Sequence, residues 1–193
     1  MRHLTAIWGA LVLSCLVGLF LYQVEAGAGA QAPFQWPGGL QLGARGNLLM
    51  LVHPHCPCSR ASLAQLASVL RERTDAPSTY VVFVSPPGSS TEWSQTDLWR
   101  SARALPGVVA IDDRGGQIGQ RFGAATSGQV LFYDARGWLR FSGGLTPIRG
   151  HEGASEGMAA LVQALESSDH RLQPPAPVYG CPLFSEEDEI CSH

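Results

Sequence analysis

Two cysteines and two histidines lie within residues 53–60, which read HPHCPCSR. Thiolates attack disulfides and bind soft metal ions, while imidazoles bind metals and exchange protons near neutral pH. This segment therefore predicts redox or metal chemistry. Only one residue separates Cys56 from Cys58, whereas redox motifs of the Cys-X-X-Cys type have two residues between the thiols.

Cys56 lies where a buried strand is expected to turn into a helix. Residues 48–52 form a continuous apolar run, and residues 56–73 carry apolar side chains at helical spacing. A cysteine at the start of a helix lies beside free N–H groups and the positive end of the helix dipole, which stabilise its thiolate. We therefore predict that Cys56 is a nucleophile whose thiolate is also stabilised by His55 and Arg60. The alternative is that Cys56 forms one inert half of a structural disulfide.

The partner of Cys56 is left open between two cysteines. Positions i and i+2 of a regular helix point about 200° apart, so a Cys56–Cys58 disulfide requires Cys56 or Pro57 to lie outside the helix. Cys181 follows a proline-rich segment, so the tail can fold back and supply a resolving thiol. A structural Cys181–Cys191 disulfide within the tail competes with this pairing, and the sequence does not choose between them.

The composition fits one well-buried domain with short appendages. The chain has 193 residues, of which 45% are hydrophobic and 15% are charged. Its formal net charge of -3 provides no basic surface, so we expect no nucleic-acid partner. All 13 residues counted as Lys or Arg are arginines, which excludes Schiff-base and other lysine chemistry.

The first segment of the chain favours a membrane anchor. Residues 4–24 carry no charged side chain and would form a helix about 30 Å long, enough to cross a hydrocarbon core. Small residues after this run also allow cleavage as a signal peptide, but the run is longer than the usual secretory core. With Arg2 retained inside, the rest of the chain is expected to be exported to an oxidising compartment.

Strands and helices alternate through the rest of the chain. The order of elements predicts an α/β fold with helices on both faces of a sheet. Further strands are predicted at 80–84, 108–112, 130–134 and 139–142, and further helices at 97–104, 117–122 and 155–165. The predicted organisation is a membrane anchor or signal segment at 1–26, a linker at 27–46, the main domain at 47–168, and a proline-rich, acidic, cysteine-containing tail at 169–193.

This order, with a cysteine at the start of the first long helix, resembles the thioredoxin superfamily over residues 40–165. The resemblance is to its membrane-tethered, extracytoplasmic TlpA/ResA-like branch, whose pattern A-P-W-C-x-P-C-R overlays HPHCPCSR. Residues 122–134 overlay a second pattern of this branch, Y-G-V-x-G-x-P-x-x-x-x-x-D, without a gap. Together with the segments FGAATSG, FSGG, RGHEG and YGCPL, the HPHCPCSR motif looks most like the bacterial RedB-like proteins.

The resemblance implies a thioredoxin-like three-layer α/β/α sandwich with a central mixed sheet, on the periplasmic side of a bacterial inner membrane. It implies thiol–disulfide exchange with thiol- or disulfide-bearing proteins, without a cofactor. Cys56 would attack a substrate disulfide, and Cys58 or Cys181 would resolve the mixed disulfide. Ser59 stands at the family's resolving cysteine. Gly128 stands at its cis-proline, so Ser127 and Gly128 would line the docking groove.

Two other functions remain open. The thiolates of Cys56 and Cys58, with His55 and the distant His151, suit Cu(I) and resemble a Sco-type copper metallochaperone, although that family spaces its cysteines C-x-x-x-C. The other alternative is a non-catalytic thioredoxin-fold interaction module.

Overall fold

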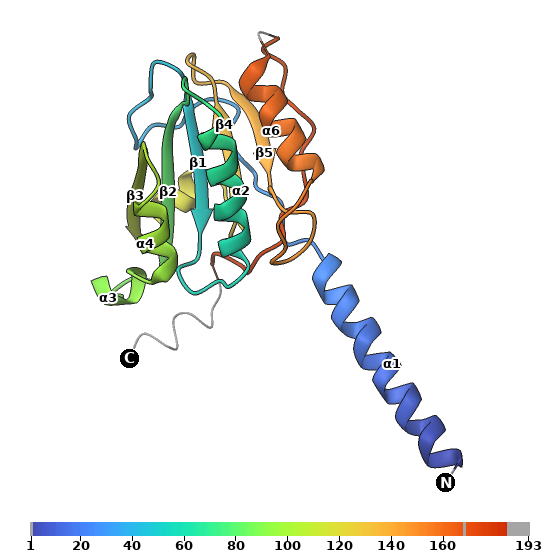
Figure 1. Ribbon diagram of the computed structural model, residues 1–193. Coiled ribbons are helices and arrows are strands. Elements are labelled where there is room, and N and C mark those ends of the chain that lie inside the picture. Colours follow the sequence, from blue (N-terminus) through green and yellow to red (C-terminus); the bar gives the residue numbers. More distant parts are fainter. Residues whose placement is uncertain (1, 168, 185–193) are drawn as a thin grey trace.

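A five-stranded mixed sheet forms the centre of the computed structural model, which describes residues 2–167 and 169–184 (Figure 1). The strand order is β3-β2-β1-β4-β5, with β1, β2 and β3 parallel and β4 and β5 antiparallel to their neighbours. This is the strand arrangement of the thioredoxin fold, so the predicted fold class is confirmed. The strands are β1 (Asn47–Val52), β2 (Ser78–Ser85), β3 (Val108–Arg114), β4 (Gln129–Tyr133) and β5 (Leu139–Gly143).

The central strand β1 is buried on both faces because alternate side chains enter two different cores. Leu48 and Met50 face the first core, which the apolar sides of α2, α4 and α6 complete. Leu49 and Leu51 face the second core, which contains α5 and segments of the linker and tail. The helices on the domain are α2 (Ser59–Arg71), α3 (Thr91–Ser94), α4 (Asp97–Arg103), α5 (Gln117–Arg121) and α6 (Glu156–Glu166).

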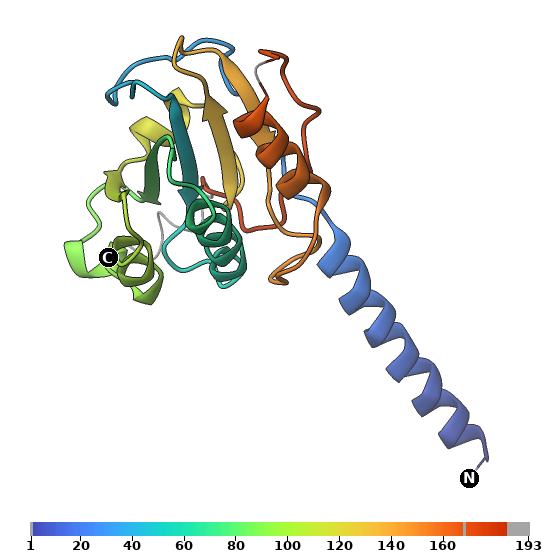
Figure 2. The same ribbon diagram turned by 45° about the horizontal axis from the view of Figure 1, so that its top comes forward.

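The N-terminal helix α1 (Arg2–Val24) projects away from the domain in both views (Figure 1 and Figure 2). Its segment Thr5–Val24 is long and apolar enough to cross a membrane, and none of that span is buried against the described residues. The helix therefore has the length and composition predicted for an anchor.

The linker and the tail pack on the domain. The N–H of Gly27 in the linker donates to the carbonyl of Val178 in the tail at 2.9 Å. Trp36 lies edge-on to Phe122 and Tyr133, with ring centroids 4.9 and 5.2 Å apart. Leu183 in the tail is 3% exposed within the second core. Both segments thus help to cover the face of the sheet that the short α5 leaves open.

Leu66 on α2 is fully buried against the sheet, so truncating it should leave a cavity. We expect Leu66→Ala to lower the free energy of unfolding by about 2–5 kcal/mol. Val109→Ala, at a side chain 53% exposed on β3, is the control and should cost about 0.5 kcal/mol or less. Urea unfolding of the full chain in detergent measures both. Equal losses for the two variants would contradict the assigned core.

Candidate functional site

Cys56 lies in a turn that precedes α2, because the helix begins at Ser59 and not at Cys56 as predicted. The Cys56 N–H donates to the carbonyl of His53 at 3.1 Å, and the Ser59 N–H donates to the carbonyl of Cys56 at 3.2 Å. Pro57 explains the late start, since a residue that precedes proline avoids the helical conformation. Cys58 becomes the N-cap residue, and Cys56 keeps its place beside the end of β1.

The sulfur of Cys56 is buried and surrounded by hydrogen-bond donors. The side chain is 3% exposed, and the Cys181 N–H donates to its Sγ at 3.4 Å. The pKa of Cys56 falls to about 4, chiefly through a hydrogen bond from the Cys181 thiol. Burial opposes this shift, and the Ser59 hydroxyl, the Cys181 N–H and the Ser127 hydroxyl add to it. Cys56 is therefore a thiolate at neutral pH.

The two serines beside Cys56 are held by a shared hydrogen-bond network. The hydroxyl oxygens of Ser59 and Ser127 are 2.7 Å apart, and the His53 N–H donates to the Ser127 Oγ at 2.7 Å. Both serine side chains are fully buried. Ser59, which the sequence resemblance aligned with a resolving thiol, thus supplies a hydroxyl to the thiolate.

The two neighbouring cysteines favour the thiol form. The pKa of Cys181 is raised, first by its hydrogen bond to the Cys56 thiolate and then by burial. Burial raises the pKa of Cys58, and the negative Cys56 raises it further. All three cysteines are free in the structure. The site therefore holds one thiolate and two thiols, while the predicted alternative pairing with Cys191 lies outside the described residues.

The tail reaches the site as an extended segment that lies against the loop before β4. The Ser127 N–H donates to the carbonyl of Cys181 at 2.8 Å, and the Leu183 N–H donates to the carbonyl of Ala125 at 2.9 Å. Between these bonds, Thr126 and Pro182 form an antiparallel bridge. The tail thus folds back, as the sequence analysis allowed, and Cys181 lies directly against Cys56.

The same pairing covers the residues expected to line a docking groove. Ser127 is buried below the tail, and the Gly128 N–H donates to the carbonyl of Leu51 in β1 at 2.8 Å. Gly128 has a φ of 92°, and a Cβ there would lie 2.9 Å from the Ser62 hydroxyl, so glycine is required. Substrate contact at Ser127 and Gly128 stays a prediction, and it would require the tail to move.

Arg60 and His55 are engaged by partners other than the thiolate. Arg60 is 64% exposed in its side chain and pairs with Asp97 of α4 at 3.6 Å. The His55 Nε2–H donates to the carbonyl of Trp93 at 3.0 Å, and its ring packs against that indole. Because α2 begins late, Arg60 faces α4 and is absent from the groups that shift the pKa of Cys56. Their predicted roles at the thiolate therefore have no support in this geometry.

The cationic side chain beside the thiols is Arg149, which the sequence did not single out. It follows β5 in the RGHEG segment, far along the chain from HPHCPCSR. Arg149 opposes the rise in the pKa of Cys58 through its charge and a side-chain hydrogen bond. No local pattern marks it, since its position depends on the path of the tail.

The proposed copper ligands are not assembled into one site. His151 is exposed and its Nδ1–H donates to the carbonyl of Arg149 at 2.8 Å, while His55 is engaged with Trp93. Among the described residues, no three or more His, Cys, Asp or Glu side chains form a group that could hold a metal ion. The predicted set of Cys56, Cys58, His55 and His151 is therefore not gathered into one site in this conformation, and copper binding stays a prediction.

Comparison with known proteins yields no matching family model and no matching curated protein. Solved structures do match. One is a hypothetical protein from Sinorhizobium meliloti 1021, with a TM-score of 0.57 and 16% identity. The match covers 84% of this chain and 96% of that protein. Another is an uncharacterized conserved protein from Geobacillus kaustophilus, with a TM-score of 0.56 and 17% identity. Here the match covers 84% of this chain and 93% of that protein. At these identities the likeness shows the fold alone.

A secreted disulfide oxidoreductase from Mycobacterium tuberculosis, described as homologous to E. coli DsbE, matches more loosely. Its TM-score is 0.42 at 16% identity, and the match covers 64% of this chain and 82% of that one. A likeness this loose carries no argument about activity. The fold and the site together define a thioredoxin-fold protein with a buried thiolate before α2 and a second thiol supplied by its own tail.

Removing the thiol of Cys181 should raise the pKa of Cys56, because that thiol is the largest contribution to the lowering. In the reduced full chain, titration of thiolate ultraviolet absorbance should show a group with a pKa of about 4 that shifts upward in Cys181→Ala. Cys15→Ala, in α1 and outside the site, is the control and should leave the low-pKa step unchanged. A wild-type chain in which every thiol titrates near the ordinary cysteine pKa would contradict the assignment.

Proposed function

We propose that this chain is a membrane-anchored, extracytoplasmic thiol–disulfide oxidoreductase with Cys56 as its nucleophile. The observation that carries the proposal is the buried Cys56 sulfur, which accepts hydrogen bonds from both the N–H and the thiol of Cys181. A thiolate is the attacking species in disulfide exchange, and a thiol in contact with it is placed to complete the reaction.

The exchange proceeds in two balanced steps. The Cys56 thiolate attacks one sulfur of a substrate disulfide, the substrate S–S bond breaks, and the other substrate sulfur leaves as a thiolate. The Cys181 thiol then loses its proton and attacks the Cys56 sulfur, which releases the second substrate sulfur as a thiolate. The substrate gains two electrons and the chain loses two, as a Cys56–Cys181 disulfide. The reverse sequence oxidises a dithiol substrate.

Cys181 is better placed than Cys58 to resolve the mixed disulfide. The peptide N–H and the thiol of Cys181 both bond to the Cys56 sulfur, and the thiol bond is the largest cause of the shifts in the pKa of both cysteines. The side-chain hydrogen bond between Cys58 and Cys56 is the smallest of the causes that shift the pKa of Cys58, and among the described residues the Cys58 N–H does not donate to the sulfur. Cys58 is joined to Cys56 through Pro57 and has the helical backbone of an N-cap residue, with φ -68° and ψ -26°. A disulfide across this single residue would close a small ring with strained geometry.

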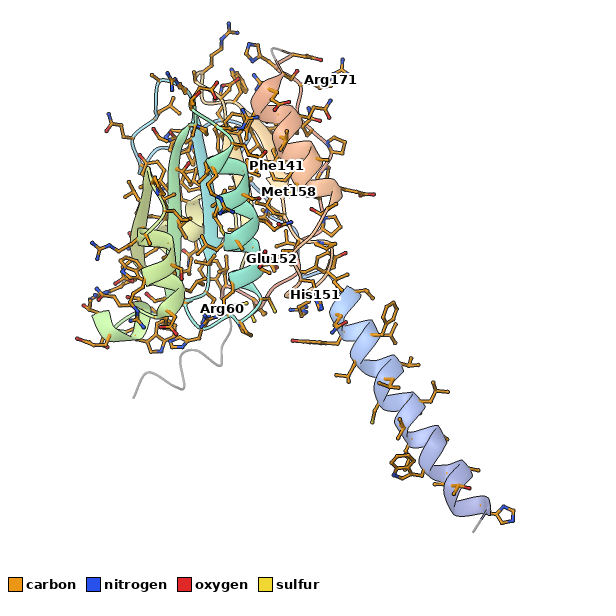
Figure 3. All side chains as sticks on the ribbon, in the orientation of Figure 1. Arg60, Phe141, His151, Glu152, Met158 and Arg171 are labelled. Carbon is orange, nitrogen blue, oxygen red and sulfur yellow. The ribbon has the colours of Figure 1, made fainter. Side chains whose placement is uncertain are left out.

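The position of α1 agrees with action at a membrane surface. Arg60 near the start of α2 and His151 beside the end of α1 both lie at the end of the domain from which α1 leaves (Figure 3). A spanning α1 would therefore hold the thiols close to the bilayer surface. The proposed substrates are thiol- or disulfide-bearing proteins in the same compartment.

Three serine variants of the full chain in detergent test the proposal, with glutathione disulfide as the substrate. Cys56→Ser should abolish exchange, because the attacking thiolate is gone. Cys181→Ser should form the mixed disulfide and accumulate it, and the reduced Cys58→Ser chain should complete one round of exchange at a rate within about threefold of the wild type. Undiminished exchange in Cys56→Ser would overturn the mechanism, and accumulation in Cys58→Ser alone would make Cys58 the resolving thiol.

A further inference from the structure

The side chain of Arg149 connects two segments that are distant in the sequence. Its Nη1–H donates to the carbonyl of Gly180 in the tail at 2.7 Å. Its Nη2–H and Nε–H donate to the carbonyls of Glu25 at 3.1 Å and Tyr22 at 3.3 Å. The guanidinium also lies 4.6 Å from the centre of the Tyr22 ring. One planar cation therefore links the end of α1 to the tail at Gly180.

The carbonyl that Arg149 binds belongs to the peptide unit that contacts the nucleophile. The Gly180 C=O accepts from Arg149, and the Cys181 N–H of the same peptide donates to the Cys56 Sγ at 3.4 Å. In a trans peptide these two groups point in opposite directions, so fixing the carbonyl fixes the N–H. A charged donor on the carbonyl also polarises the peptide and strengthens the bond that its N–H makes.

Within the part of the chain that the structure describes, Arg149 is the hydrogen-bond partner of the Gly180 carbonyl. The tail pairs with the loop before β4 from Cys181 onward, through bonds to the Ser127 N–H and the Ala125 carbonyl. Gly180 is buried, and a Cβ at this position would overlap the carbonyl of Ser127. Only glycine therefore fits here. The Gly27 N–H holds the Val178 carbonyl upstream, so Arg149 fixes the Gly180 peptide between this bond and the pairing that begins at Cys181.

We propose that Arg149 is a positioning residue for thiol–disulfide exchange, holding the Gly180–Cys181 peptide so that Cys181 faces Cys56 and tying this arrangement to the end of α1. This role deepens the proposed function and rests on it, since it assigns a group that serves the resolving step. The guanidinium reaches the reacting sulfur of Cys56 through the peptide, and its charge also opposes the rise in the pKa of the Cys181 thiol. Lysine cannot replace it fully, because one ammonium group lacks the fork that reaches both segments.

The test compares Arg149→Gln and Arg149→Lys with Arg136→Gln in the full chain in detergent. Arg136 is exposed in the turn between β4 and β5 and serves as the matched control. With glutathione disulfide in single-turnover experiments, Arg149→Gln should slow resolution of the mixed disulfide by about tenfold or more. Its formation, followed above the Cys56 pKa, should stay within about threefold of the wild type. Arg149→Lys should be intermediate and Arg136→Gln unchanged.

The pH titration of the Cys56 thiolate gives a second readout that a general loss of stability would not produce. Arg149→Gln should move the titration upward, because the Cys181 N–H and thiol that lower the Cys56 pKa are less firmly placed. Arg149→Lys keeps the charge and the aliphatic stem, so it carries the test if the glutamine variant does not fold. Wild-type resolution and a wild-type Cys56 titration in Arg149→Gln would overturn the positioning role.

Failure of the two proposals is distinguishable. If the wild-type chain performs no exchange, the proposed function falls, and the titration still decides whether Arg149 orients the peptide. If the wild type exchanges through Cys56 while all Arg149 variants behave like it, only the role of Arg149 is lost.

Discussion

The contact between the Cys56 sulfur and the Gly180–Cys181 peptide is the interaction on which the rest of the site depends. It joins the turn before α2 to the tail, two parts of the chain 125 residues apart. For this contact to form, the tail must cross the second face of the sheet, bury Leu183 and pair with the loop before β4. The core and the candidate site are therefore stabilised by the same segment.

Burial and charge act against each other at Cys56, and the outcome is decided by the number of donors. A thiolate that is 3% exposed loses most of its hydration, which by itself favours the neutral thiol. The Cys181 thiol and N–H and two serine hydroxyls offset that cost. The stabilised charge then disfavours ionisation of Cys58 and Cys181. One sulfur becomes the nucleophile, and its neighbours remain proton-bearing.

Local patterns predicted the fold well, because they record which side chains are buried. The apolar run 48–52 became the central strand, and the alternation of elements correctly indicated an α/β fold. The start of α2 was missed because helical spacing continues back to residue 56, while Pro57 prevents the backbone from following it. The spacing of four residues predicted that Arg60 shares a helix face with Cys56. Because α2 begins at Ser59, Cys56 is not on the helix, and the Arg60 side chain pairs with Asp97 instead.

The residues that shape the site from a distance lay beyond sequence reasoning. Arg149 and Gly180 are 31 residues apart, and only the return of the tail brings them together.

The central claim is that Cys181 is the redox partner of Cys56. Disulfide mapping by mass spectrometry, after the full chain is oxidised by one equivalent of a two-electron oxidant, tests it most directly. The account predicts a Cys56–Cys181 disulfide as the main product, and a predominance of Cys56–Cys58 or Cys181–Cys191 would contradict it.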